Sequence, residues 1–185
     1  MAKSIEEYFG DINELSGGEE RSVRWYRDKV REVLPAKINE SMVTKLIFAG
    51  NKTNKPTYGG MQLFGYLPKH EQTLPYYDIF PLVIPIKRLP DGFVGINFHY
   101  LSIPLRLKLL QKMIPMAREG TQMGWNRVAR LRYIKPCVKR YLNSYTRSRF
   151  LKIDEDDFAM ACMLPIHTFK KRPYRSVHAE SRKMG

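Results

Sequence analysis

The sequence predicts an α+β fold, in which an antiparallel sheet or small barrel of three to five strands is flanked by N- and C-terminal helices. Two apolar runs, residues 79–86 and 93–100, are rich in β-branched and aromatic residues and are joined by a Pro-Asp-Gly turn, so they predict a β-hairpin. Segments on both sides of the hairpin repeat apolar residues at helical spacing. A chain of 185 residues that is 43% hydrophobic can bury one compact core.

The hairpin should form the centre of the sheet. Pro81 and Pro85 have no N–H to donate, so the first strand is expected at an edge of the sheet or with a bulge. A third strand is predicted at 61–67, after Gly59-Gly60. Much of the buried surface of this sheet is expected to come from Phe80, Val83, Ile84, Phe93, Ile96 and Phe98.

Residues 1–50 are predicted to form an N-terminal helical segment. Ser16 and Glu19 match a capping box at the start of a helix over 17–34, and a second, shorter helix is expected at 39–48. Both segments carry apolar residues at helical spacing.

A polar loop at 50–56 is the best boundary between this segment and an α+β core over 57–169. In the second half of the chain, further helices are predicted at 102–115, 125–133, 136–145 and 154–164, of which three start at Ser102, Pro136 and Asp154. The first of these helices should place Leu105, Leu109, Leu110 and Met113 inward and Arg106, Lys108 and Lys112 around its polar side. The apolar stripe of the third would be Val138, Tyr141, Leu142 and Tyr145.

The positive charge is concentrated in one part of the chain. The net charge is +14, and the residues between Asp91 and Asp154 include thirteen Lys or Arg against one acid, Glu119. This asymmetry points to a polyanionic partner, either nucleic acid or an acidic protein surface, although a solvated basic face is the simpler alternative. The candidate polyanion-binding residues are Arg127, Arg130, Arg132, Lys135, Lys139, Arg140, Arg147 and Arg149.

The aromatic residues among these cations could stack on bases, but their helical spacing is more typical of core packing. Residues 170–185 lack an apolar stripe and are predicted to form an extended, basic C-terminal arm. Its Lys170, Lys171, Arg172 and Arg175 would dock on a neighbouring protein.

Candidate catalytic groups have structural explanations. The acidic run 154–157 could bind metal ions, but consecutive acids before an apolar run are typical of a helix start. His99 could pair with Asp78, yet it could equally be a buried sheet histidine, and no nucleophile motif accompanies it. Cys137 and Cys162 are expected to be reduced packing residues. The sequence therefore predicts no enzyme activity, no cofactor and no metal site.

Three stretches of the chain resemble a virion structural protein family of contractile-tailed bacteriophages. They are Leu74–Pro85 (LPYYDxFPLxxP), Asp91–Leu101 (DGFxGxNxHYL) and the segment Lys135–Phe150, which starts with KPCxKRYL and ends with SRF. The resemblance covers roughly 61–169.

This resemblance implies a non-enzymatic structural component of the neck or baseplate, oligomeric or bound to other virion proteins, whose basic face contacts double-stranded DNA or acidic neighbours. An alternative is a DNA-end-binding protein that travels with the packaged genome and protects its termini. A third possibility is a small nuclease that uses Asp78, His99 and the acidic run. The protein is expected in the virion after synthesis in the host cytoplasm, because no signal peptide or membrane span is evident in the sequence.

Overall fold

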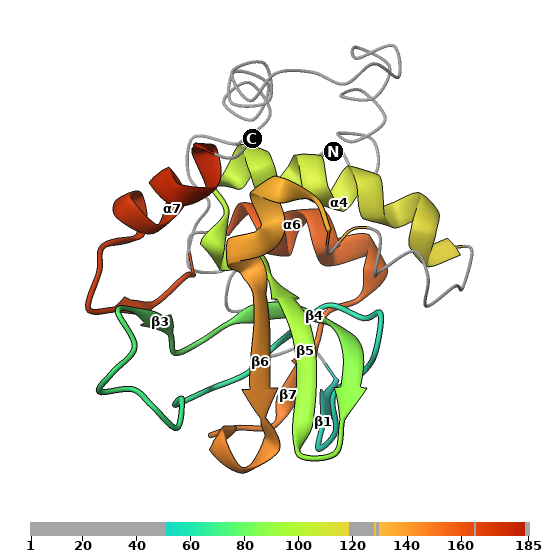
Figure 1. Cartoon of the computed structure of the whole chain (residues 1–185). Coiled ribbons are helices and arrows are strands. Elements are labelled where there is room, and N and C mark those ends of the chain that lie inside the picture. Colours follow the sequence, from blue (N-terminus) through green and yellow to red (C-terminus); the bar gives the residue numbers. More distant parts are fainter. Residues whose placement is uncertain (1–50, 119–127, 129, 165, 184–185) are drawn as a thin grey trace.

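A computed structural model describes residues 51–118, 128, 130–164 and 166–183 of the chain (Figure 1). The two N-terminal helices predicted within 1–50 lie outside these described residues, as do residues 125–127 and 129 of the helix predicted at 125–133. The remaining predictions can be compared with the structure directly.

Among the described residues, the main sheet has six strands, all antiparallel to their neighbours. Their order is β1 (Lys52–Thr53), β7 (Phe150–Lys152), β2 (Gln62–Leu63), β4 (Leu82–Leu89), β5 (Gly92–Asn97) and β6 (Val138–Leu142). A second, two-stranded sheet pairs β3 (Tyr77–Asp78) with β8 (Phe169–Lys170). The α+β class is confirmed; the main sheet has one strand more than the predicted maximum and is not a closed barrel.

The predicted hairpin is confirmed as β4 and β5. Ile84 pairs with Ile96, and the register shifts between Pro85 and Lys87, so the predicted bulge is present. The alternative of an edge strand is wrong, because β4 lies between β2 and β5.

Two glycines of β5 are required by close approach of the neighbouring strands. A Cβ atom on Gly92 would lie 1.9 Å from the carbonyl oxygen of Tyr141, and a Cβ atom on Gly95 would lie 2.3 Å from Cγ1 of Val83. Both glycines lie within β5, so the close packing of β4, β5 and β6 requires them.

The helix predicted at 136–145 is wrong. Residues Arg132–Cys137 form the 3₁₀ helix η2, Val138–Leu142 form β6, and a second 3₁₀ turn, η3, covers Asn143–Tyr145. Strand β6 completes the sheet on the free side of β5, where Phe93 pairs with Tyr141. This long-range pairing overrides the local helical spacing, and the β-branched and aromatic residues of the segment suit a strand.

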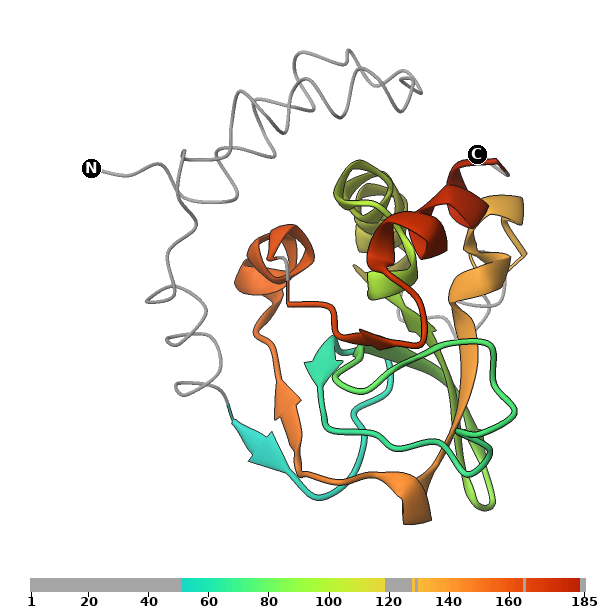
Figure 2. The same cartoon turned by 90° about the vertical axis from the view of Figure 1, so that its left-hand side faces the viewer.

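The helices gather at one end of the main sheet (Figures 1 and 2). Helix α4 (Ile103–Arg118) starts directly after Ser102, as predicted, but it continues through Pro115. It packs against α6 (Phe158–Met163), which follows the 3₁₀ turn η4 (Glu155–Asp157). The acidic run therefore lies at a helix start, as predicted.

One face of the sheet and the helices enclose the main hydrophobic core, which includes Ile84, Ile96, Phe98 and Leu109. A second cluster, made largely of aromatic side chains, packs on the other face. There the Phe64 ring lies 5.3 Å from the Tyr141 ring on β6 and 4.9 Å from the Phe150 ring on β7. Since β6 and β7 are not adjacent strands, the sheet must curl around Phe64.

The extended conformation predicted for the C-terminal arm is present at Lys170, in β8, but it is wrong for residues 174–182, which form a helix. Strand β8 pairs with β3, and helix α7 (Tyr174–Arg182) packs against η2 and against the 3₁₀ turn η1 (Phe98–Tyr100). Its Val177, His178 and Ser181 are buried. The Oγ atom of Ser181 donates a hydrogen bond to the carbonyl of Tyr100 at 2.6 Å. Helix α7 is therefore attached to the core by hydrogen bonds of buried polar side chains, since its sequence has no apolar stripe.

Cys137 and Cys162 are both free and buried, which confirms that they are packing residues. Within the described part of the chain, the helices are too short or too polar to cross a lipid bilayer.

Candidate nucleic-acid interface

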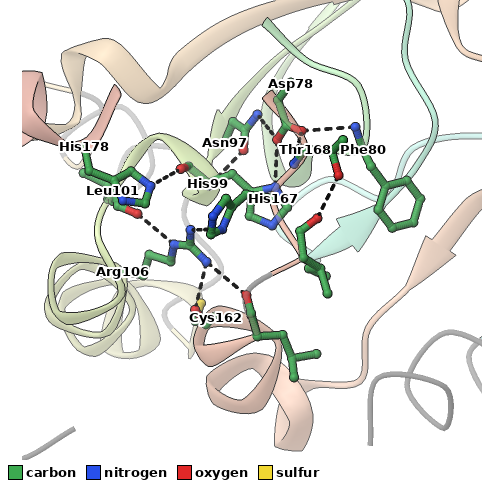
Figure 3. Close-up of polar contacts among 12 residues, drawn as sticks. Asp78, Phe80, Asn97, His99, Leu101, Arg106, Cys162, His167, Thr168 and His178 are labelled. Atoms are coloured by element: carbon green, nitrogen blue, oxygen red, sulfur yellow. Dashed lines mark hydrogen bonds and ion pairs between the residues drawn. The ribbon is translucent and has the colours of Figure 1, made fainter. Parts of the chain in front are cut away.

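A buried polar network joins the small sheet, the hairpin and the helices (Figure 3). At its centre the Asp78 carboxylate lies 2.7 Å from Nδ1 of His99, and both side chains are fully buried. Asn97 donates to the same carboxylate, whose other oxygen accepts the backbone N–H groups of Phe80 and Thr168. The pairing of Asp78 with His99 that the sequence suggested is therefore present.

Asp78 is ionised and His99 is neutral. Burial by itself disfavours a carboxylate, but His99 and the hydrogen bonds to Phe80 and Asn97 keep the pKa of Asp78 below its usual value. Burial, together with nearby Arg106, lowers the pKa of His99. The imidazole therefore donates its Nδ1 proton to Asp78, and its Nε2 has no hydrogen-bond partner among the described residues.

Arg106 occupies the other side of the network. Its guanidinium donates to the carbonyls of Leu101, Cys162 and Leu164 and to Nδ1 of His167. The prediction that Arg106 lies on the polar side of its helix is wrong, because the side chain is completely buried. Burial lowers the pKa of Arg106 to about 10, which leaves it charged at neutral pH. The Asp78 carboxylate compensates this charge within the same network.

Two further histidines complete the network and attach α7. Nε2 of His178 donates to the His99 carbonyl at 2.8 Å, while His167 accepts from Arg106. Burial is the largest cause that lowers the pKa of His167, to about 4, and that of His178, to about 3. All three histidines are therefore neutral at physiological pH.

An aspartate-oriented, neutral imidazole is the arrangement of a general base. His99, however, is 0% exposed, so its Nε2 cannot reach a substrate in this conformation. The network instead fixes β3, α4 and α7 relative to one another. Among the described residues no group of three or more His, Cys, Asp or Glu side chains could hold a metal ion.

Exposed cations form two surfaces. We call the first the strand-tip surface; its residues are Lys52, Arg88, Arg147 and Arg149, and its segments lie at the end of the main sheet away from the helices (Figure 1).

Cation–aromatic contacts and hydrogen bonds hold the strand-tip surface together. The guanidinium of Arg88 lies 5.1 Å from the centre of the Tyr58 ring, and that of Arg147 lies 5.8 Å from the Tyr145 ring. Both tyrosines pack against the same aromatic cluster. The turn between β4 and β5 is joined to η3 by a backbone hydrogen bond, and its Asp91 is neutralised by Arg140 at 2.7 Å.

The second surface lies on η2 and α7, which pack side by side (Figure 2). We call it the η2–α7 surface; its exposed cations are Arg130, Arg132, Lys135, Arg175, Arg182 and Lys183. Residues 130–137 and 174–183 contain one acid, Glu180, which Arg172 neutralises at 2.8 Å. This surface unites residues from two candidate sets that the sequence analysis had kept apart.

The eight predicted polyanion-binding residues do not form one site. Arg130, Arg132 and Lys135 belong to the η2–α7 surface, Arg147 and Arg149 belong to the strand-tip surface, and Arg127 lies outside the described residues. Lys139 is partly buried, with its amine 4.2 Å from the centre of the Tyr100 ring, and Arg140 pairs with Asp91. Core packing is confirmed for Tyr133 and Tyr141, whose side chains are buried.

Two of the four predicted docking residues are engaged within the chain. Lys171 has a positive φ of 69° and donates to the carbonyls of Glu71, Gln72 and Leu74, and Arg172 binds Glu180. Lys170 and Arg175 are exposed. Docking itself stays a prediction.

Sequence reasoning missed four members of these surfaces, namely Lys52, Arg88, Arg182 and Lys183. Each was part of the overall charge count but lay outside the two candidate sets, which were drawn from residues 127–149 and 170–175. Arg88 had a local signal, since Lys87-Arg88 lies close to the hairpin turn at 90–92, separated from it by Leu89.

The comparisons with known proteins identify a family. The model of one family, described as Phage T4 terminal DNA protecting protein, matches residues 12–181. No curated protein and no solved structure gives a significant match. Because the matched segment covers nearly the whole chain, the protein belongs to the Phage T4 terminal DNA protecting protein family.

Proposed function

We propose that this protein binds the ends of a phage DNA genome and protects them from degradation. The description of its family supports a role as a DNA-end-binding protein over a structural role in the neck or baseplate, which no observation supports. The observation that carries the proposal is the excess of exposed Lys and Arg on two surfaces whose nearby acids, Asp91 and Glu180, are already paired.

Surfaces of this kind suit a phosphate backbone. Each Lys or Arg that neutralises a phosphate releases condensed counterions, which gives affinity without a dependence on base sequence. Such binding fits a protein that must act on DNA termini whatever their sequence. The two surfaces lie on different elements, one at the tips of the β-strands and the other on η2 and α7. The protein could therefore hold more than one segment of DNA, or both strands of one duplex.

We propose a non-enzymatic mechanism. The buried Asp78–His99 pair would fix the fold around the binding surfaces, and protection would follow from occupation of the DNA end. The protein would travel with the packaged genome in the virion, where further virion proteins could be its neighbours.

A salt titration of DNA binding tests this function. For the parent protein and a short blunt duplex, the logarithm of affinity should fall with the logarithm of salt concentration, with a slope of about −0.9 per phosphate contacted. Arg132→Glu and Arg147→Glu, one on each surface, should each weaken binding and reduce the slope by at least ~1.

Lys69→Glu provides the matched control. Lys69 is exposed and belongs to neither surface. Its replacement by Glu changes the net charge by the same amount as Arg132→Glu or Arg147→Glu. Affinity that is independent of salt, or that drops equally in all three variants, would contradict binding through these surfaces.

A further inference from the structure

One aromatic side chain stands apart from the packed core. Tyr174, at the start of α7, is 43% exposed and is the only exposed large hydrophobic side chain among the residues that the structure describes. The other aromatic residues described are buried or partly covered. An exposed ring is therefore available to a partner at the η2–α7 surface.

The ring is held in place from below. Its centre lies 4.6 Å from the His167 ring and 5.5 Å from the His178 ring. Both histidines belong to the buried network, in which His167 accepts from Arg106 and His178 donates to the His99 carbonyl. Tyr174 thus rests on a support that is already ordered, so a partner would pay little entropy to immobilise it.

Positive charge lies next to the ring. Arg175 follows Tyr174 directly and is exposed, and the guanidinium of Arg182 reaches back along α7 to the Arg175 carbonyl at 3.4 Å. Both arginines therefore lie on one flank of α7. The helix has no acid in its first turn. A partner that fits here combines a flat apolar surface with negative charges beside it.

We infer that the Tyr174 ring stacks on the terminal base pair of duplex DNA, while Arg175 and Arg182 contact the phosphates beside it. This inference rests on the proposed function and adds the means by which an end is distinguished from internal duplex. Within a duplex each base pair is covered by its neighbours, whereas the last pair exposes one π-face. Aromatic stacking on that face requires no particular base.

Two labelled duplexes of the same sequence test this inference. One has blunt open ends, and the other is sealed at both ends by hairpin loops. The parent should bind the open duplex more tightly. Tyr174→Ala should reduce affinity for the open duplex by roughly 5- to 140-fold, which corresponds to the ~1–3 kcal/mol of one base–aromatic stack, and leave affinity for the sealed duplex unchanged.

Two control variants accompany this measurement. Tyr174→Phe keeps the ring and should retain the preference for open ends. Tyr77→Ala removes a half-buried tyrosine of β3 whose hydroxyl donates to Glu71, and it should also retain the preference. Loss of the preference in Tyr77→Ala as well would overturn the assignment to Tyr174.

A second readout does not depend on how well a variant folds. The fluorescence of 2-aminopurine at the terminal position of the open duplex should change when the parent or Tyr174→Phe binds, and should not change at an internal position. If the parent prefers open ends but shows no such change, or if Tyr174→Ala keeps the preference, stacking by Tyr174 is overturned while end binding stands. A parent that binds both duplexes equally, or neither, overturns the proposed function together with this inference.

Discussion

Lowering the pH below 6.5 should destabilise this protein. Its buried histidines are neutral in the folded state and take up protons when the chain unfolds. In the unfolded chain a histidine titrates near pH 6.5. In the folded protein, burial lowers the pKa of His178 to about 3 and that of His167 to about 4. Between pH 6.5 and about 4 the unfolded state therefore binds more protons than the folded state, and stability falls as the pH falls. The full contribution is present above pH 6.5.

The size of this effect follows from the pKa differences. One pKa unit corresponds to 1.36 kcal/mol, so lowering the pH from 6.5 to 4 should remove on the order of 3 kcal/mol through His178. His167 is partly exposed and should contribute less, because solvent screens its environment. A loss of this size is a large part of the free energy of unfolding of a typical domain.

Urea unfolding at a series of pH values measures the effect. In the parent, the free energy of unfolding should decline steadily from pH 6.5 to 4. His178→Gln removes the titrating group but retains an N–H donor for the His99 carbonyl, so its decline should be shallower. His70→Gln, at an exposed position, is the matched control and should follow the parent. A parent whose stability is flat over this range, or a His178→Gln variant with the parent's slope, would refute the reasoning.

Three further predictions concern the fold and can be checked by thermal and urea unfolding. Gly92→Ala should lower the free energy of unfolding by at least ~1–3 kcal/mol, because its Cβ atom would collide with the Tyr141 carbonyl. Gly65→Ala, whose Cβ atom would have its nearest contact at 3.5 Å, should be tolerated, and equal stability of the two variants would contradict the strand packing. Phe98→Ala should cost roughly 3–5 kcal/mol, since the ring is completely buried, and a parent-like melt would place Phe98 at the surface. Deletion of residues 170–185 should lower the melting temperature clearly, because it removes Lys170 of β8 and the whole of α7. An unchanged melt would show that α7 does not pack on the core.

Local signals were sufficient for part of the fold. The hairpin was predictable because its strands, its turn and its bulge are all encoded within one short segment. The start of α4 at Ser102 and the helix start at the acidic run were also visible. The strand β6 was not, because its conformation depends on pairing with β5, and a short run of mixed residues is compatible with either period.

The site was harder to predict than the fold. Arg106 looked like a solvent-exposed cation because two of its hydrogen-bond acceptors, the carbonyls of Cys162 and Leu164, are distant in sequence. Helix α7 looked unstructured because His178 and Ser181 are buried through hydrogen bonds rather than apolar contacts. The excess of basic residues at 127–149 was visible in the sequence. Because this segment folds into η2, β6 and η3 instead of one helix, its cations are divided between two surfaces.

Digestion of DNA by an exonuclease that starts only at free ends tests the central claim most directly. Linear duplex should survive longer as the parent protein is added, with full protection once both ends are occupied, and Arg132→Glu should require higher concentrations. A circular duplex cut by an endonuclease should be degraded at the same rate with and without the protein at these concentrations. Digestion of the linear duplex that is unchanged by folded protein at low salt would contradict the proposal that this chain protects DNA termini.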